Sequence, residues 1–195
     1  MISKLSLKTA NYLVKNNTIH KFDVEVYNYA FFMIYSCVIF FILTITFGLI
    51  FGSFLESLIF YFLFTSIRIY AGGYHASSEE KCMIISSVSV LFSIIAINIS
   101  EIYEMYKLLF ILSLISAVGI LLLCPLDTPK KILSKKEKKY YFKICLIVLI
   151  VILIVSISSY FKHLNVLFFP SCISLVLENV LLIVGYIKKI HVIKL

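Results

Sequence analysis

A short hydrophilic stretch, residues 68–82 with the sequence RIYAGGYHASSEEKC, concentrates reactive residue types between two long apolar runs. It contains a histidine, His75, seven residues before a cysteine, Cys82. A thiol becomes a strong nucleophile once it loses its proton, and a neighbouring histidine favours that loss. The pair predicts nucleophilic catalysis in which Cys82 attacks a carbonyl carbon and His75 acts first as a base and then as an acid.

The glycine pair Gly72–Gly73 must interrupt a helix that enters this stretch, because adjacent glycines weaken helices and favour turns. Ser77 and Glu80 then have the S-x-x-E spacing of a helix-capping box, just ahead of the next apolar run. We predict that one helix ends near Tyr70 and that the chain turns at the glycines. A second helix should start near Ser77 and carry Cys82 in its second turn.

Other residues of the stretch suggest supporting roles. The backbone N–H groups of Gly72 and Gly73 can hold an oxyanion, because no side chain blocks a substrate there. Arg68 can bind a substrate carboxylate or a lipid phosphate. Glu79, Glu80 or a backbone carbonyl can orient the histidine, although both glutamates equally suit the first turn of a helix.

Each of these residues also has a purely structural interpretation, as an interfacial histidine, a buried thiol or an arginine that anchors a span. The functional interpretation is favoured because the residues occur in order in one segment of a chain with only four histidines. One histidine and one cysteine supply two metal ligands, whereas a structural zinc ion takes four. We therefore predict neither a metal site nor a cofactor.

The composition predicts an integral membrane protein. Of the 195 residues 62% are hydrophobic, and the mean hydropathy is +1.04, whereas a soluble domain is about 45–50% apolar. We predict one all-α bundle, residues 1–195, because open sheet edges cannot face lipid. The candidate spans are residues 29–51, 54–70, 83–99, 106–123, 142–160 and 165–187. Some barely reach the ~20 residues that a bilayer needs, so four spans and two re-entrant segments are the alternative.

Lysines are concentrated on one side of this predicted bundle. They lie in the N-terminal segment 1–28, in the loop 124–143 and in the tail 188–195. The positive-inside rule places these segments, both termini and the stretch 68–82 in the cytoplasm, in a multi-pass protein of the cell membrane. The net charge of +8 then indicates contact with anionic membrane lipid rather than with nucleic acid.

The N-terminal segment has an amphipathic pattern of its own. On a helical wheel Ile2, Leu5, Tyr12 and Leu13 fall together beside a sector of lysines. This pattern predicts a helix that lies in the headgroup plane of the membrane. A frayed tail is the alternative, because several residues here are poor helix formers.

The chain has five cysteines, an odd number without a C-x-x-C pair. Cytosolic thiols stay reduced, so we predict no disulfide framework and a free thiol at Cys82. Cys37, Cys145 and Cys172 lie inside apolar runs and are interpreted as small buried hydrophobes. Their loss should be tolerated, whereas removal of the Cys82 thiol should abolish activity.

The order R-x-x-x-G-G-x-H, followed seven residues later by a cysteine, resembles the accessory gene regulator B (AgrB) family, and here it comprises Arg68, Gly72, Gly73, His75 and Cys82. The resemblance extends to chain length, the basic N-terminal segment, the number of spans and the loop sequence CPLDTPKK, so it covers most of the chain. Members of this family are multi-span membrane cysteine endopeptidases of Gram-positive bacteria.

The resemblance implies a quorum-sensing activity and a peptide partner. Such proteins process a short AgrD-like precursor peptide with an amphipathic leader and an acidic tail. They remove the tail through an acyl-enzyme thioester and help to close a thiolactone or lactone ring, which gives the autoinducing peptide. Lys130, Lys131, Lys135 and Lys136 can attract that acidic tail, and a loop that sets topology and binds lipid is the alternative. We also expect a homodimer, on no residue pattern of this chain.

A small transporter or channel is the competing interpretation. Glu178 in the sixth span, together with Glu56, is an intramembrane ionisable residue, and such residues mark polar pathways. We expect, however, that Glu178 lacks a cationic partner in another span, and the second half of the chain does not repeat the first. A scaffold or sensor subunit is a third interpretation, but it leaves the clustering of His75 and Cys82 unexplained.

Overall fold

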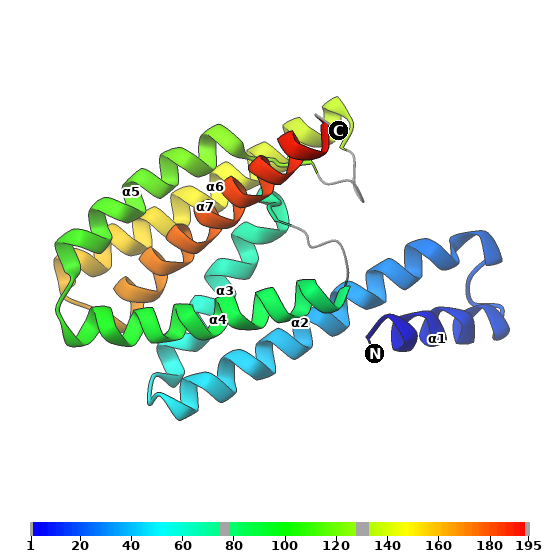
Figure 1. The fold of residues 1–195 in the computed structure, drawn as a ribbon, viewed down its shortest axis with the longest axis horizontal. Helices are drawn as coiled ribbons and strands as arrows, with labels where there is room; N and C mark the ends of the chain where they lie inside the picture. Colours follow the sequence, from blue (N-terminus) through cyan, green and yellow to red (C-terminus); the bar gives the residue numbers. More distant parts are fainter. Residues whose placement is uncertain (1, 75–78, 128–132, 194–195) are drawn as a thin grey trace.

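The computed structural model describes residues 2–74, 79–127 and 133–193. Within these ranges the chain forms seven α-helices and one short 3-10 helix, so the all-α prediction is confirmed (Figure 1). The elements are α1 (Ile2–Lys15), η1 (Lys21–Asp23), α2 (Val24–Ile50), α3 (Phe54–Ala71), α4 (Glu79–Ile102), α5 (Tyr106–Leu123), α6 (Lys135–Lys162) and α7 (Asn165–Ile193).

Six helices among the described residues, α2 to α7, are long and apolar enough to cross a membrane. Each overlaps one predicted span, and all but the first span, which ends one residue beyond α2, lie wholly within their helix, so the prediction of about six spans is confirmed. Most helices extend beyond their predicted span. α6 begins seven residues earlier than predicted, because Ser134 and Glu137 form a capping box that starts the helix ahead of its apolar run.

α7 is the central helix of the bundle. In its apolar stretch 56% of the residues are buried, against 17–28% in the other five membrane-spanning helices. It packs against α3, α4, α5 and α6. Ser171 and Ser174 are buried in α7 and donate hydrogen bonds at 2.8 Å to carbonyls of the same helix, so small side chains with satisfied hydroxyls allow its neighbours to approach closely.

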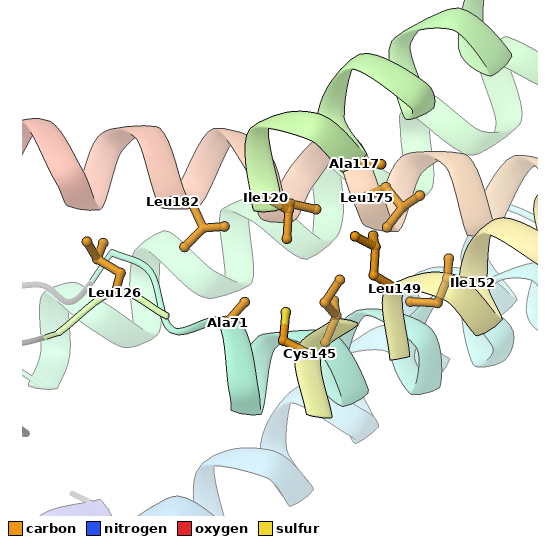
Figure 2. Packing of buried hydrophobic residues seen from close by; sticks show 10 residues of the cluster. Ala71, Ala117, Ile120, Leu126, Cys145, Leu149, Ile152, Leu175 and Leu182 are labelled. Carbon is orange, nitrogen blue, oxygen red and sulfur yellow. The ribbon is translucent and has the colours of Figure 1, made fainter. Parts of the chain in front are cut away.

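Two apolar clusters fill the bundle. The first joins α3, α5, α6 and α7 to the segment that follows α5 (Figure 2), and it consists of Ile67, Ala71, Ala117, Ile120, Leu126, Cys145, Leu149, Ile152, Leu175 and Leu182. The second is rich in aromatic rings and lies around the first turns of α7. Its buried members are Phe60, Ile97, Leu109, Phe168, Phe169, Cys172 and Ile173.

The N-terminal segment forms a helix, α1, that packs along the first half of α2 (Figure 1). The alternative of a frayed tail is therefore wrong for residues 2–15. The residues buried against α2 are Ile2, Ser6 and Ala10. Ser6 Oγ also donates a hydrogen bond to Asn28 Oδ1 at 2.6 Å. Leu5 and Tyr12 of the predicted apolar face stay exposed, so the position of α1 in the headgroup plane remains a prediction.

Candidate active site

α3 ends in a turn built on the glycine pair, as the sequence predicts. The N–H of Gly72 donates to the carbonyl of Arg68 at 3.2 Å and closes the helix. Gly72 and Gly73 have φ angles of 83° and 128°, a region that glycine adopts without the steric cost of a side chain. The chain therefore leaves the helix at Gly72, and Tyr74 is the last described residue before His75.

The side chain of Arg68 folds back into this turn. Its Nη1 donates to the carbonyl oxygen of Gly72 at 2.7 Å, and its Nη2 donates to the carbonyl oxygen of Tyr74 at 2.8 Å. A Cβ atom at Gly73 would overlap the guanidinium, so the missing side chain makes room for it. The planar guanidinium thus bridges two backbone carbonyls of the turn, as its fixed fork of donors allows.

The turn is also attached to the backbone of α7. The N–H of Tyr74 donates to the carbonyl of Leu181 at 3.0 Å. Gly185 permits this approach, because a Cβ atom there would lie 2.8 Å from both the carbonyl carbon of Gly73 and the nitrogen of Tyr74. An ordinary side chain at position 185 would therefore separate the turn from the central helix.

A third attachment comes from the segment after α5. The N–H of Leu126 donates to the carbonyl of Ala71 at 2.9 Å, and Leu126 forms an isolated parallel bridge with Gly72. The side chain of Leu126 is buried in the cluster that also contains Leu182 of α7 (Figure 2). The turn is thus held by Arg68 of α3, by the backbone of α7 and by the segment after α5.

Glu178 lies beneath the turn, and its expected lack of a cationic partner is wrong. Its Oε1 is 3.5 Å from Nη1 of Arg68, and the Glu178 side chain is fully buried, whereas the Arg68 side chain is 23% exposed. The pair forms because α3 packs along α7 with Arg68 in its last turn. Breaking a buried pair costs about 3–5 kcal/mol, and partial exposure of one partner moves the cost to the lower figure.

The second glutamate of the transport interpretation does not join the first. Glu56 lies in the first turn of α3, 12 residues before Arg68 and so about 18 Å further along the helix axis. Glu178 is instead occupied by its ion pair with Arg68. The two glutamates therefore do not form a single acidic site, and the transport interpretation loses the argument that Glu178 is unpaired.

The predicted nucleophile lies near the start of α4. Cys82 is a free, half-buried thiol in this helix, which begins at Glu79 among the described residues. His75 and Ser77 lie outside the described residues, as do the side chains of Glu79 and Glu80. The structure thus fixes both ends of the segment that carries His75, the turn at Tyr74 and the helix that contains Cys82.

The other four cysteines are free thiols as well. Cys145 and Cys172 are buried, as predicted, and Cys172 Sγ lies 3.1 Å from Ser156 Oγ. Cys37 was expected to be buried but is half-buried in α2, because this helix is one of the least covered in the bundle. Cys37 and Cys82 therefore have similar exposure.

The lysine-rich loop is organised around an acidic residue. Asp127 forms ion pairs with Lys138 at the start of α6 and, at 3.6 Å, with Lys189 near the end of α7. Burial opposes ionisation of this carboxyl group, but the hydrogen bonds from Lys138 and the Leu133 N–H and the charges of both lysines outweigh burial and lower the pKa of Asp127 below its usual value. Lys130 and Lys131 lie outside the described residues, and Lys135 and Lys136 are exposed.

A shallow pocket of about 340 Å³ lies at the opposite end of the bundle, and it is lined by Glu104, Met105, Tyr106, Lys107, Leu108, Tyr160 and His163. None of the predicted site residues contributes to it. Within the part of the chain that the structure describes, no group of three or more His, Cys, Asp or Glu side chains is arranged to hold a metal ion.

The sequence pattern did not reveal the partners that come from α7. Glu178 pairs with Arg68 through its charge, and Leu181 accepts the hydrogen bond of Tyr74 through its backbone carbonyl. Gly185 leaves room for the turn because it has no side chain. The one available signal was that the second and sixth spans contain ionisable residues of opposite sign. Such residues favour pairing inside a membrane.

Comparison with known proteins identifies one match. A family model described as Accessory gene regulator B matches residues 6–185. Neither a search of curated proteins nor a search of solved structures found a match. The matched range includes the turn, α4 with its cysteine and most of α7.

Proposed function

The chain belongs to the accessory gene regulator B family, which supports a role in the agr quorum-sensing system with an AgrD-type precursor peptide as partner, and we propose that it is the cysteine endopeptidase of that system. In this proposal it removes the C-terminal tail of the precursor and promotes closure of a thiolactone or lactone ring. The proposed location is the cell membrane, with both termini and the site on the cytoplasmic side.

The observation that carries this proposal is the fixed turn next to the histidine. Tyr74 is bound to α7 through its N–H and to Arg68 through its carbonyl, and His75 follows it directly in the sequence. A general base must stay within hydrogen-bond reach of the group that it deprotonates. A turn that is fixed just before His75 and a helix that holds Cys82 support this pairing, because they limit the positions that the two residues can take.

The proposed reaction begins with transfer of a proton from the Cys82 thiol to His75. The thiolate sulfur forms a bond to the scissile carbonyl carbon, the C–N bond breaks, and His75 returns the proton to the departing amine. The product is an acyl-enzyme thioester and the free acidic tail. When a thiol of the peptide attacks this thioester, one thioester replaces another at little cost in free energy, and Cys82 regains its proton.

Ring closure competes with hydrolysis of the same thioester. Water would give a linear acid, so the site must exclude water and hold the nucleophile of the peptide close to the thioester carbonyl. A site at the surface of a membrane, with the leader helix of the peptide anchored beside it, meets both conditions. The exposed Lys135 and Lys136, with Lys130 and Lys131, are proposed to attract the acidic tail.

Mass spectrometry of the co-expressed precursor tests the proposal. The candidate substrate is the short peptide encoded next to this gene, expressed with the wild-type protein, with Cys82→Ala or with Cys37→Ala. Cys37→Ala is the matched control because both cysteines are half-buried in long helices. We expect tail removal with the wild type and with Cys37→Ala and complete loss with Cys82→Ala, because Cys82 is the thiol that is proposed to form the thioester. Processing by Cys82→Ala would show that the nucleophile is wrongly assigned.

A further inference from the structure

Glu178 is a charged side chain that the proposed reaction does not use. Its side chain is completely buried, and among the described residues neither carboxylate oxygen has a hydrogen-bond partner. Its ion pair with Arg68, at 3.5 Å, is the contact that compensates its charge. A buried carboxylate is costly unless it is paired, so its place directly below the turn requires a reason.

We propose that Glu178 is a positioning residue of the candidate active site. It holds the guanidinium of Arg68, which in turn holds the carbonyls of Gly72 and Tyr74, the residue directly before His75 in the sequence. This inference rests on the proposed function, because it assigns Glu178 to the positioning of the proposed base. It replaces the transport pathway as the reason for an ionisable residue in α7.

The geometry of the guanidinium explains how one carboxylate can fix the turn. Nη1 of Arg68 is shared between the carbonyl of Gly72 and Oε1 of Glu178, while Nη2 donates to Tyr74. Because the guanidinium is planar and its donors are fixed relative to one another, the contact of Nη1 with Glu178 also fixes the direction in which Nη2 points toward Tyr74. Arg68 is 23% exposed, so without Glu178 water and lipid phosphates would compete for it.

The face of α7 beneath the turn is specialised along its length. Glu178, Leu181, Leu182 and Gly185 have the i, i+3, i+4, i+7 spacing of one helical face. They supply, in order, the counterion of Arg68, the acceptor for the Tyr74 N–H, a buried contact in the apolar cluster and the space for the turn. Glu178 is thus part of a continuous surface that supports the turn, and its charge is not isolated.

Alkylation of Cys82 measures the position of His75 without knowledge of the peptide. Iodoacetamide forms an S–C bond with the thiolate and releases iodide, so at about pH 7 the rate depends on a base beside the thiol, whereas at about pH 10 it depends on access alone. The rate at about pH 7 divided by the rate at about pH 10 is the ratio of interest. Both rates are measured by mass spectrometry on the full-length protein in lipid nanodiscs. A variant that only disturbs the packing changes both rates, whereas a displaced His75 lowers the ratio.

The variants are chosen to separate charge from folding. We expect Glu178→Gln to lower the ratio of the two rates by about tenfold, in the same direction as His75→Ala. Glu178→Gln combined with His75→Ala should show no further loss beyond that of His75→Ala alone. Glu56→Gln is the matched control, because it removes a glutamate at the other end of α3, and it should keep the ratio of the wild type. Arg68→Met combined with Glu178→Met removes both charges without leaving one unpaired, and it should fold and show the same low ratio.

The outcomes distinguish this inference from the proposed function. A low ratio for His75→Ala with an unchanged ratio for both Glu178→Gln and the double methionine variant overturns the positioning role and leaves the peptidase proposal in place. Equal losses at both pH values in the Glu178 variants also overturn it, in favour of a purely structural role. An unchanged ratio for His75→Ala overturns the proposed pairing of His75 with Cys82, and the role of Glu178 falls with it.

Discussion

Two regions of the central helix α7 are held by different interactions. From its middle toward its C-terminal end, one hydrogen bond from Tyr74 to Leu181 and the ion pair of Arg68 with Glu178 attach the turn at Gly72–Tyr74 to α7. Near its N-terminal end the contacts are between rings: Tyr106 lies 5.5 Å from Phe168 and 5.0 Å from Phe169 between ring centroids. The phenol of Tyr106 also donates to Asn165 Oδ1 at 2.6 Å.

The two kinds of contact contribute differently to the stability of the bundle and to the precision with which backbone atoms are placed. Ring packing is strong and tolerates small shifts, because dispersion and burial depend weakly on direction. Hydrogen bonds to backbone atoms fix both distance and angle, and catalysis loses much of its rate when a base is displaced by about 1 Å. The turn of the candidate site is therefore attached to α7 by directional contacts, whereas ring packing makes the main contribution at the N-terminal end of the helix.

The largest expected effect comes from adding one methyl group at Gly185. Its Cβ would lie 2.8 Å from backbone atoms of Gly73 and Tyr74, so the turn must move away from α7. We expect Gly185→Ala to lower the rate of precursor processing by about 100-fold, measured as tail release per folded protein.

Gly48→Ala provides the control for that comparison. A Cβ at Gly48 would meet the hydroxyl oxygen of Ser57 at 2.7 Å, so a similar crowding occurs between two helices away from the turn. Its processing rate should stay within about twofold of the wild type, because no hydrogen bond of the turn is displaced. Equal loss of processing in both variants would remove the distinction between the two regions.

A smaller effect, on stability alone, is expected at the aromatic end. Tyr106→Phe keeps the ring contacts and removes the hydrogen bond to Asn165, which should cost about 1 kcal/mol in the free energy of unfolding. Thermal unfolding in detergent measures that loss, and tail release per folded protein should not change. A fall in processing would mean that α7 transmits changes at one end to the other.

The smallest effect is expected at Asp127 and depends on pH. Because its folded-state pKa is lowered from 3.8, the ionised carboxylate stabilises the fold above that pH, and the contribution is lost as the pH falls through the lower folded-state value. Asp127→Asn should therefore lower stability at about pH 7 by less than about 1 kcal/mol. The difference should shrink as the pH falls below 3.8, and a loss that is independent of pH would exclude an electrostatic origin.

The sequence predicted the features that depend on neighbours along the chain. Apolar runs located all six long helices, and the glycine pair located the end of α3, because helix length and turn formation are local properties. The pairing of Arg68 with Glu178 depends on which helices pack together, which no local pattern encodes. The same holds for Gly185, because the turn that it makes room for lies more than 100 residues earlier in the chain. The start of α6 was missed because Ser134 and Glu137 lie in a lysine-rich segment that was interpreted as a loop.

The capping box at Ser134 starts α6 ahead of its apolar run, so Lys135 and Lys136 belong to the helix. α6 contains 28 residues and is therefore about 42 Å long, about 12 Å more than a hydrocarbon core of ~30 Å. On the proposed topology, part of this excess extends past the hydrocarbon core at the N-terminal end of α6 and places Lys135 and Lys136 near the lipid phosphates. If these lysines attract the acidic tail as proposed, peptide carboxylates and lipid headgroups compete for the same cations, and the anionic lipid content of the host membrane then affects how strongly the tail is captured.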